Sequence, residues 1–351
     1  MPAHGHVLMF PAWTTAPYIT QLIAHLSDGG WDVTAADRRG FVHGLRAKDT
    51  LVHIHWPEAL TPDRSIFDGV FAWACLPLIA LAARRGGVVW TVHNFEPHEG
   101  FPPLVGRRYY RALARCVSAL IVHRESTREK VAQTFGRGRK IYLTPQASFG
   151  AVHGALPTRG DARVDLGIDP DALVFVQLGQ LRGYKLPVET INAFRQASPK
   201  RALLLMSGRC PDAALRDEID TAAEGASDVR VETEFLSDED LVTRIAASDW
   251  MIAPYRAIEN PTTLQLAIAY DRPVIAPRLA AVEEALGAHP SILYDSAVEA
   301  QPEIAAAFSL VADGLDLERA TNQSPMVTWT DQARATAAVY EDVRAANNSR
   351  R

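Results

Sequence analysis

The sequence predicts an α/β protein that contains two doubly wound domains in tandem, each built on a mainly parallel sheet. Two observations predict this architecture. Short apolar runs of strand length alternate with segments of helical periodicity, which is typical of parallel strands joined by helices. The alternation also stops near the middle of the chain and then begins again, and the length of 351 residues suits two domains of ordinary size.

The first half begins with an apolar run at His6–Phe10, and a helical segment follows at Tyr18–Leu26. The longest apolar stretch, Val70–Ala83, is shorter than the roughly 20 residues that cross a bilayer, so it predicts a buried helix. The other expected strands are Trp31–Ala35, Leu51–His55, Val88–Val92, Leu120–His123 and Lys140–Leu143. The other expected helices are Ile66–Arg84, Leu104–Cys116 and Ser126–Phe135.

A stretch rich in glycine, proline and small residues, Gly150 to Gly160, has no clear periodicity and predicts the interdomain linker. In the second half, apolar runs again alternate with helical segments. Two such sheets leave a cleft between the carboxyl ends of their strands, where ligands bind. Its expected strands are Leu173–Leu178, Ala202–Ser207, Val229–Glu232, Trp250–Ala253 and Val274–Ala276. Its expected helices are Pro187–Arg195, Ala213–Ala223, Glu239–Ala247, Thr262–Tyr270, Glu303–Val311 and Thr330–Ala346.

Composition and charge exclude several classes of protein. The net charge of -5 argues against a general nucleic-acid binder, which is normally basic. The three cysteines lie far apart, so neither a disulfide framework nor a cysteine zinc site is expected, and a reducing compartment fits. The first residues contain no basic region followed by an apolar run, so we expect no secretion signal and a cytoplasmic protein.

Two common nucleotide-binding motifs are missing. The sequence contains no G-x-x-x-x-G-K-[ST] segment, and no G-x-G-x-x-G follows the first expected strand. Both motifs depend on glycine-rich loops that cradle phosphates. A P-loop enzyme and a nicotinamide enzyme are therefore disfavoured.

The loop after the first strand of the second half carries two cations, Arg182 and Lys185. Cations at the carboxyl edge of a sheet can neutralise a diphosphate, and an arginine can bind one bidentately. The alternative interpretation is a solvated loop with incidental charges, since loops are usually polar.

A second loop links the expected strand Trp250–Ala253 to a helix. Asn260 suits the helix N-cap and Pro261 the first helical position, which places Thr262 and Thr263 in the first turn. Free amides there can hold phosphate oxygens, and Glu259 can accept hydrogen bonds from ribose hydroxyls. An ordinary capped helix explains Asn260 and Pro261, but it explains the paired threonines and Tyr255-Arg256 less well.

Histidines follow two strands of the first half. His53 and His55 share one strand face, because the side-chain period of a strand is two. His93 ends another strand, and the polar loop after it contains Glu96, His98 and Glu99. Such residues at a strand's carboxyl end suit acid–base chemistry or contacts to sugar hydroxyls. We expect a structural role for His53 and His98 and a functional one for His93, and no recognised zinc-ligand spacing is present.

A basic segment with aromatics, Arg107–Arg115, follows the apolar residues 101–105. A helix of this composition can rest on an anionic membrane surface. A solvated helix face that covers the sheet is the alternative, and the composition favours it somewhat.

Several of these segments together resemble a known group of enzymes, the family 4-like GT-B glycosyltransferases. The pairing of "HIHWPE" at 53–58 with "TVHNFEPHE" at 91–99 is similar to bacterial exopolysaccharide and glycolipid mannosyltransferases that use GDP-mannose. The resemblance covers nearly the whole chain. The segments of the second half that carry it are Gly179…Arg182…Tyr184-Lys185, Ser248-Asp249…Ala253-Pro254-Tyr255-Arg256 and Ala269…Arg272-Pro273-Val274-Ile275-Ala276.

The resemblance implies a GT-B fold, in which two Rossmann-like doubly wound domains face an interdomain cleft. Residues 1–152 would form an acceptor-binding domain, residues 163–325 a nucleotide-sugar-binding domain, and residues 326–351 a C-terminal helix that packs back on the first domain. The implied activity is transfer of a hexose, with mannose favoured, from a nucleotide diphosphate sugar to a glycan, glycolipid or small-molecule hydroxyl. No metal or other cofactor is implied, and a peripheral position on the inner face of the membrane fits a lipid-linked acceptor.

The resemblance also implies roles for single residues. The implied set is Arg182, Lys185, Thr262 and Thr263 for the donor diphosphate; Glu259, Tyr255 and Arg256 for the nucleoside; His93, Glu96 and Glu99 for catalysis; and Trp13, Tyr18, His55 and His98 for acceptor or sugar contacts.

The chain departs from the family pattern at four positions. Two glutamates eight positions apart in the family fall on Ile258 and Leu266 here, Gln180 stands where many relatives have arginine, and Gln146 where many have histidine. The sequence therefore leaves open whether transfer retains or inverts the anomeric configuration. A non-hydrolysing nucleotide-sugar epimerase and a non-catalytic sugar-nucleotide-binding subunit remain alternative functions.

Overall fold

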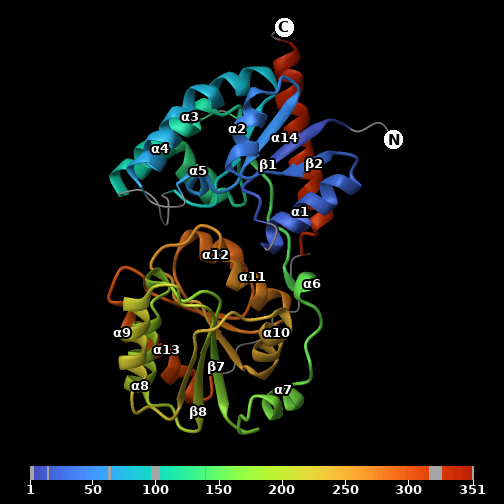
Figure 1. Cartoon of the computed structure of the whole chain (residues 1–351). Coiled ribbons are helices and arrows are strands. Elements are labelled where there is room, and N and C mark those ends of the chain that lie inside the picture. Colours follow the sequence, from blue (N-terminus) through green and yellow to red (C-terminus); the bar gives the residue numbers. More distant parts are fainter. Residues whose placement is uncertain are drawn as a thin grey trace. The chain divides into compact units, whose positions relative to one another are not determined.

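The computed structural model describes residues 4–13, 16–61, 65–95, 103–138, 140–315 and 326–349 (Figure 1). The chain divides into two compact units. The first comprises Met1–Ala147 together with Val327–Arg351, and the second comprises Ser148–Met326. The chain therefore leaves the first unit, builds the second and returns to the first.

The first unit contains a six-stranded parallel sheet with the strand order β2-β1-β3-β4-β5-β6. The strands are β1 (His6–Phe10), β2 (Asp32–Ala35), β3 (Thr50–Ile54), β4 (Val88–Thr91), β5 (Ala119–Val122) and β6 (Ile141–Leu143). The helices are α1 (Pro17–Asp28), α2 (Arg38–Arg46), α3 (Ile66–Arg85), α4 (Pro103–Cys116), α5 (Glu125–Phe135) and α14 (Trp329–Asn348), with a 3-10 turn η1 at Pro57–Leu60.

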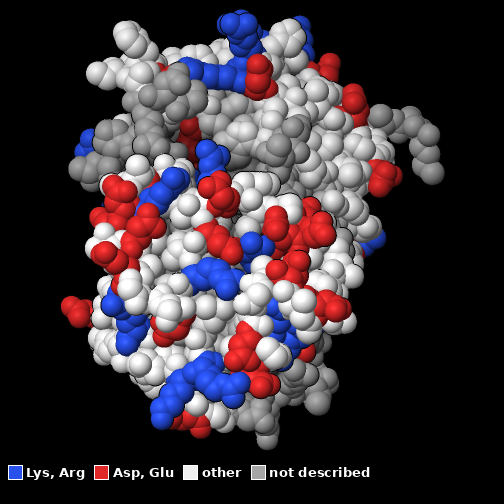
Figure 2. Space-filling model, turned by 60° about the horizontal axis from the view of Figure 1, so that its bottom comes forward, with Lys and Arg blue, Asp and Glu red and all other residues white. Residues whose placement is uncertain are grey.

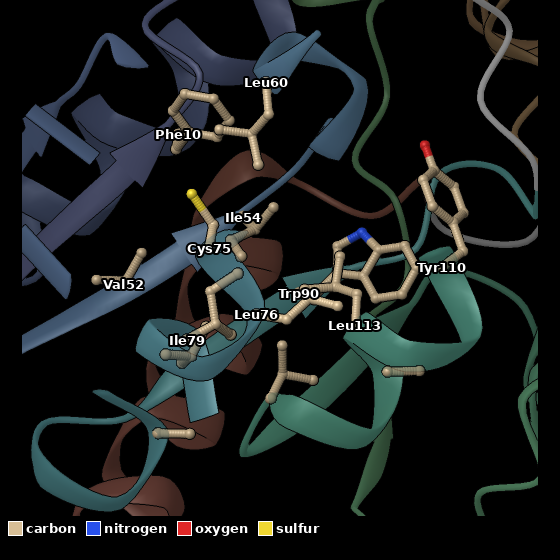
Figure 3. Close-up of a cluster of buried hydrophobic side chains, with 14 of the residues drawn as sticks. Phe10, Val52, Ile54, Leu60, Cys75, Leu76, Ile79, Trp90, Tyr110 and Leu113 are labelled. Carbon is tan, nitrogen blue, oxygen red and sulfur yellow. The ribbon is translucent and has the colours of Figure 1, made fainter. Parts of the chain in front are cut away.

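Helices cover both faces of this sheet. On one face α2, α3, α4 and α5 enclose a core in which Ile54 and Trp90 of the sheet meet Cys75 and Ile79 of α3 and Leu113 of α4 (Figure 3). The helix α14 packs against α1 and β5. The last helix of the chain thus completes the first unit.

Helix α3 corrects one expectation. The apolar stretch Val70–Ala83 was predicted to be buried, but Val70 is 63% exposed and Leu81 is 40% exposed. By length and composition alone α3 is also the one helix of the described residues that is apolar enough to cross a membrane. Periodicity could not predict this half-exposure, because α3 is apolar on both of its sides.

The second unit contains another six-stranded parallel sheet, with the order β12-β11-β10-β7-β8-β9. The strands are β7 (Leu173–Leu178), β8 (Ala202–Ser207), β9 (Val229–Glu232), β10 (Trp250–Ile252), β11 (Val274–Pro277) and β12 (Ser291–Tyr294). The helices are α6 (Gly150–His153), α7 (Arg159–Asp165), α8 (Pro187–Ala197), α9 (Ala213–Ala223), α10 (Asp238–Ala247), α11 (Thr262–Ala269), α12 (Ala280–Leu286) and α13 (Ala300–Ala312), with a 3-10 turn η2 at Gly183–Lys185.

The stretch predicted as an irregular linker, Gly150 to Gly160, contains one short helix and the start of a second. Helix α6 spans Gly150–His153, and α7 begins at Arg159, where the hydroxyl of Thr158 caps it by accepting from the Asp161 amide. Both helices are too short to show a helical period in the sequence. The prediction also omitted α12 and β12, which are similarly short, and the nine-residue α2, which contains two glycines.

Candidate functional site

In the first unit the polar and aromatic residues of interest gather at the carboxyl edge of the sheet. His55 follows β3 and His93 follows β4, and both are buried. Tyr18 lies in the first turns of α1, after β1, and its ring meets the rings of His55 and His93 edge-on. Strand β1 lies between β2 and β3, so the chain changes direction here. Such a switch point is where open α/β sheets bind ligands.

Three rings form a continuous stack at this edge. The indole of Trp13 lies 5.0 Å from that of Trp56, and the Trp56 ring lies 4.5 Å from the His93 imidazole at 13° between the ring planes. Trp13 is 43% exposed, whereas His93 is buried. The stack therefore leads from solvent to a buried imidazole, and a flat apolar surface beside polar groups suits a sugar ring.

A hydrogen-bond chain fixes the orientation of Tyr18. The Ala147 amide donates to Gln332 Oε1 at 2.7 Å, so Gln332 Nε2 faces and donates to the Tyr18 hydroxyl at 3.0 Å. The Tyr18 hydroxyl in turn lies 3.1 Å from Nε2 of His123, and His123 Nδ1 lies 2.7 Å from the Thr144 carbonyl oxygen. Because a carbonyl oxygen can only accept, His123 carries its proton on Nδ1 and accepts from Tyr18.

His53 lies deeper and is held at both ring nitrogens. Its Nδ1 is 2.6 Å from the hydroxyl of Tyr340 in α14, and its Nε2 is 2.8 Å from the hydroxyl of Thr91. His55 instead contacts His93, with 3.3 Å between Nδ1 and Nε2, and the Nε2 atom of His55 has no hydrogen-bond partner among the described residues. The contacts of His53 are those of a structural residue, while His55 keeps a ring nitrogen for another partner.

Burial keeps these four imidazoles neutral. Desolvation, with the charge of His123 adding to it, lowers the pKa of His53 to about 3, and desolvation lowers the pKa of His123 to about 4. The pKa values of His55 and His93 also lie well below the ordinary value, because of desolvation and then of the neighbouring histidines. At neutral pH the cluster therefore offers hydrogen-bond donors and acceptors without charge.

Three predicted residues of the first unit, Glu96, His98 and Glu99, lie outside the described residues. Within the described ranges, no group of three or more histidine, cysteine or acidic side chains is arranged to hold a metal ion.

In the second unit the cations predicted for a diphosphate lie at the carboxyl end of β7. Gly179 follows this strand at a φ of +87°, and a Cβ built on it would lie 3.2 Å from the amine of Lys185. A Cβ on Gly208, after β8, would clash with the carbonyl oxygen of Gly179. The two loops thus approach closely, and the ammonium of Lys185 lies over bare backbone where an anion can approach.

The environment of Lys185 tunes its charge. Desolvation, followed by repulsion from Arg182, lowers the Lys185 pKa to about 8. The guanidinium of Arg182 is half-buried and donates through Nη2 to Gln180 Oε1 at 2.9 Å. A dianion that binds between two such cations relieves their mutual repulsion, so its binding is favourable.

The β10–α11 loop contacts the β7 loop. The amide of Arg256 donates to the Tyr184 carbonyl oxygen at 2.8 Å, and the rings of Tyr184 and Tyr255 stack at 6.4 Å. The hydroxyl of Tyr255 is hydrogen-bonded to the Thr263 side chain. The structure therefore brings Lys185, Tyr255 and Thr263 to one edge of the second sheet, at its switch point between β7 and β10.

The start of α11 corrects the predicted cap. Pro261, rather than Asn260, is the N-cap residue, so it provides no side-chain cap and the helix begins at Thr262. The first amides of a helix have no intrahelical acceptor, which leaves the Thr262 and Thr263 turn suited to an anion. Thr262 is exposed and Glu259 is half-buried.

A cavity of about 430 Å³ lies beside this loop in the second unit. Tyr255 and Arg256, two of the predicted nucleoside contacts, line it together with Glu189 and Tyr294. The guanidinium of Arg256 lies 3.2 Å from a Glu189 carboxylate oxygen. Tyr294 is buried, and its hydroxyl has no hydrogen-bond partner among the described residues.

Sequence reasoning missed four residues that build the first edge. His123 follows β5 just as His55 and His93 follow their strands, so the same signal was available for it. Gln332 and Tyr340 lie more than 200 residues away in α14, and Thr91 is an ordinary strand residue, so no local pattern points to them.

Known proteins resemble this chain over nearly its whole length. No protein-family model matches it. A curated relative from Xanthomonas campestris pv. campestris, named GDP-mannose:glycolipid 4-beta-D-mannosyltransferase, is 26% identical over 329 residues, which are 90% of this chain and 83% of the relative. Sucrose-phosphate synthase from Thermosynechococcus elongatus has a TM-score of 0.70 at 14% identity, over 97% of this chain and 99% of that one. HepE from Anabaena, in complex with UDP-glucose, has a TM-score of 0.65 at 15% identity over 99% of both chains.

The structural matches settle the fold. Both sheets and their helices match solved glycosyltransferases over almost every residue. The chain therefore has the GT-B fold. The curated relative adds a homologue whose sequence aligns across both units.

Proposed function

We infer that this chain is a glycosyltransferase, and we propose that it transfers mannose from GDP-mannose to a hydroxyl group of a glycolipid. The observation that carries the proposal is the alignment with the Xanthomonas mannosyltransferase over 90% of the chain. The two sheet edges support it, since one gathers cations and helix amides and the other gathers neutral histidines and stacked aromatic rings.

We place the donor on the edge of the second sheet. When the sugar leaves, negative charge develops on the diphosphate and must be stabilised. Lys185 and Arg182 supply cations, and the Thr262 and Thr263 turn supplies amides and hydroxyls. Glu259, Tyr255 and Arg256 remain the proposed nucleoside contacts. With this positive charge provided by the protein, we propose that the reaction needs no metal ion or other cofactor.

We place the reacting sugar and the acceptor on the edge of the first sheet. Trp13, Tyr18 and His55 are the proposed sugar contacts. The relative is named for a β-linked product, and forming a β-mannoside from an α-linked donor inverts the configuration. Inversion needs a base for the acceptor hydroxyl.

His93 is the proposed base within the described residues, and Glu96, Glu99 and His98 remain candidates outside them. The lowered pKa of His93 keeps it unprotonated and able to accept a proton, although it also makes the imidazole a weak base. The stack with Trp56 fixes the ring plane of this imidazole.

We further propose that the protein works in the cytoplasm, at the inner face of the membrane that holds its acceptor. A glycolipid offers its sugar hydroxyls at the membrane surface, so the enzyme needs access to that surface and no passage through it. We propose no nucleic-acid partner for this function.

The decisive experiment incubates the purified chain with GDP-mannose or UDP-glucose and a detergent-solubilised glycolipid extract. We expect mannosylated glycolipid from GDP-mannose, detected by mass spectrometry, and a β linkage by NMR. Donor alone is the control, since epimerised sugar nucleotide without acceptor would favour an epimerase. Binding of GDP-mannose in calorimetry without turnover on any acceptor would contradict the proposal and favour a binding subunit.

A further inference from the structure

Helix α3 carries apolar side chains on both of its long sides. Cys75 and Ile79 point into the core beneath the sheet (Figure 3). On the opposite side Ile66 and Phe67 are each 85% exposed, and Val70 is 63% exposed. A surface helix normally presents polar residues to solvent, so packing within the first unit does not explain this side of α3.

The exposed apolar residues form one continuous stripe. They recur every three or four positions, which places them on a single helix face, and a 20-residue helix is about 30 Å long. Contiguous apolar surface of this kind, with polar residues at its rim, marks an interaction site. The α3 stripe consists of Ile66, Phe67, Val70, Trp73, Ala74, Pro77 and Leu81.

The helices beside the α3 stripe are strongly basic. Helices α2 and α4 both contact α3, and the three together contain nine arginines and one carboxylate. That carboxylate, Asp68, is buried and paired with Arg38 at 2.6 Å. The exposed arginines of the three helices are Arg39, Arg46, Arg84, Arg85, Arg107, Arg108, Arg111 and Arg115.

This concentration of one sign of charge differs from the chain as a whole. The nine arginines and one aspartate of the three helices give them a net charge of +8, whereas the net charge of the whole chain is -5, which leaves -13 for the rest. Figure 2 shows a face of the molecule on which carboxylates and cations are interspersed, as on an ordinary soluble surface. The excess of cations beside an exposed apolar stripe therefore indicates a partner that is both apolar and anionic.

We propose that the α3 stripe and the arginines beside it dock the protein on an anionic lipid surface. Apolar side chains of an interfacial helix enter the boundary of the acyl chains, while arginines bind the lipid phosphates. A second copy of the chain fits less well, because pairing the same face twice would bring the arginines of both copies together. The core side of α3 stays on the sheet, so the helix lies along the membrane and does not cross it.

The inference rests on the proposed function in one respect, since a glycolipid acceptor gives the enzyme a reason to reach a membrane. The docking itself requires neither donor nor acceptor. The experiment can therefore distinguish failure of membrane docking from failure of the proposed mannosyl transfer.

The test measures flotation of the full chain with vesicles of phosphatidylcholine alone and of phosphatidylcholine mixed with phosphatidylglycerol. We expect stronger binding to the anionic vesicles. Replacing Phe67 and Val70 together by serine should weaken binding at least about tenfold. Replacing Arg84 and Arg108 by glutamine should weaken it about fivefold for each charge on the anionic vesicles only.

Replacing Phe235 and Val164 together by serine is the matched control, because these two side chains of the second unit are 81% and 83% exposed and are of the same types as Phe67 and Val70. This control variant should bind vesicles as the wild type does. Equal melting temperatures of all variants would show that the exposed substitutions leave the fold intact.

Absence of vesicle binding, or binding that the Phe67/Val70 double variant retains, would overturn the proposal. A wild-type dimer in solution that the same double variant converts to a monomer would also overturn it, in favour of a second copy as the occupant. The Phe67/Val70 double variant should still transfer mannose to a water-soluble, short-chain acceptor. If the wild type itself shows no such transfer, the result counts against the proposed function and not against membrane docking.

Discussion

The two sheets of this protein end in different chemistry although both are six-stranded and parallel. At the edge of the first sheet, buried histidines lie among aromatic rings and carry no charge at neutral pH. At the edge of the second sheet, Lys185 and Arg182 keep positive charge beside bare backbone. The difference supports our proposal that the two edges serve different parts of a glycosyl transfer, the neutral edge binding sugars and the charged edge the diphosphate.

Each candidate edge lies at the switch point of its sheet, but the switch point falls between different strands in the two sheets. In the first sheet it falls between β1 and β3, and in the second between β7 and β10. The same architectural rule therefore provides a crevice twice, and the loop residues alone decide what each crevice binds.

The largest expected contrast between the units is their response to acid. A histidine whose folded pKa lies below its unfolded value of about 6.5 stabilises the fold above that pH, and this stability is lost as pH falls, because the unfolded chain binds more protons. His53 and His123 have folded pKa values of about 3 and 4. Each should therefore lower the free energy of unfolding by about 2 kcal/mol at about pH 5. His55 and His93 add to this loss, which is large against a total stability of about 5–15 kcal/mol.

Hydrogen exchange read by peptide should therefore show the first unit losing protection before the second as pH falls below about 6.5. Tryptophan fluorescence is a second probe, because only Trp250 lies in the second unit. His43→Gln, at an exposed position, should leave the acid midpoint unchanged. Loss of protection in the second unit first would contradict the assignment of the neutral cluster.

Removal of the charged edge should be the next largest effect. Lys185→Ala should lower kcat/KM at least about a hundredfold, because a cation that stabilises the leaving diphosphate acts mainly in the transition state. Steady-state rates with GDP-mannose give the value, and equal melting curves show that the fold is intact. Lys200→Ala, at an exposed position of the same unit, is the matched control.

The pH profile adds a signature that belongs to Lys185 itself. Its pKa of about 8 means that the charged form disappears as pH rises through that value, so the wild-type kcat/KM for the donor should fall above it. Lys185→Arg should lose this step, since a guanidinium stays protonated. Wild-type turnover in Lys185→Ala would remove the residue from the site.

A smaller effect is expected at the neutral edge. His93→Ala should lower kcat about tenfold, which is less than the roughly hundredfold at the low end for a general base, because a strongly lowered pKa makes a weak base. The KM for the donor should change little. His43→Ala controls for loss of an imidazole in the same unit, and an unchanged kcat in His93→Ala would place that ring outside the reaction.

Much of the fold was predictable, because its information is local. The strands of both sheets, apart from β12, match the predicted strands within one or two residues, and the longer helices match within three. Of the elements that were missed, α12 is too short to complete two helical periods, whereas α2 is nine residues long but contains two glycines, which disfavour a helix. Pattern reasoning therefore fails where an element is very short or contains helix breakers.

The candidate site was predictable only in part, for a different reason. Lys185 and His93 stand at strand ends, where sequence position alone suggests a ligand. Gln332 and Tyr340 meet the first edge through the return of the chain, which no local pattern records. The exposed side of α3 escaped prediction because a helix that is apolar all round is normally buried.

The return of the chain to the first unit through α14 has a consequence for the folding of the protein during its synthesis. The second unit is formed by one uninterrupted segment, whereas the first needs α14, which is made after the whole second unit. While α14 is missing, Tyr18 and His53 lack two of their partners, and α1 and β5 lack the helix that packs against them. On the ribosome the second unit can therefore fold before the first, because it needs only its own segment, whereas the first unit also needs α14, which is made later.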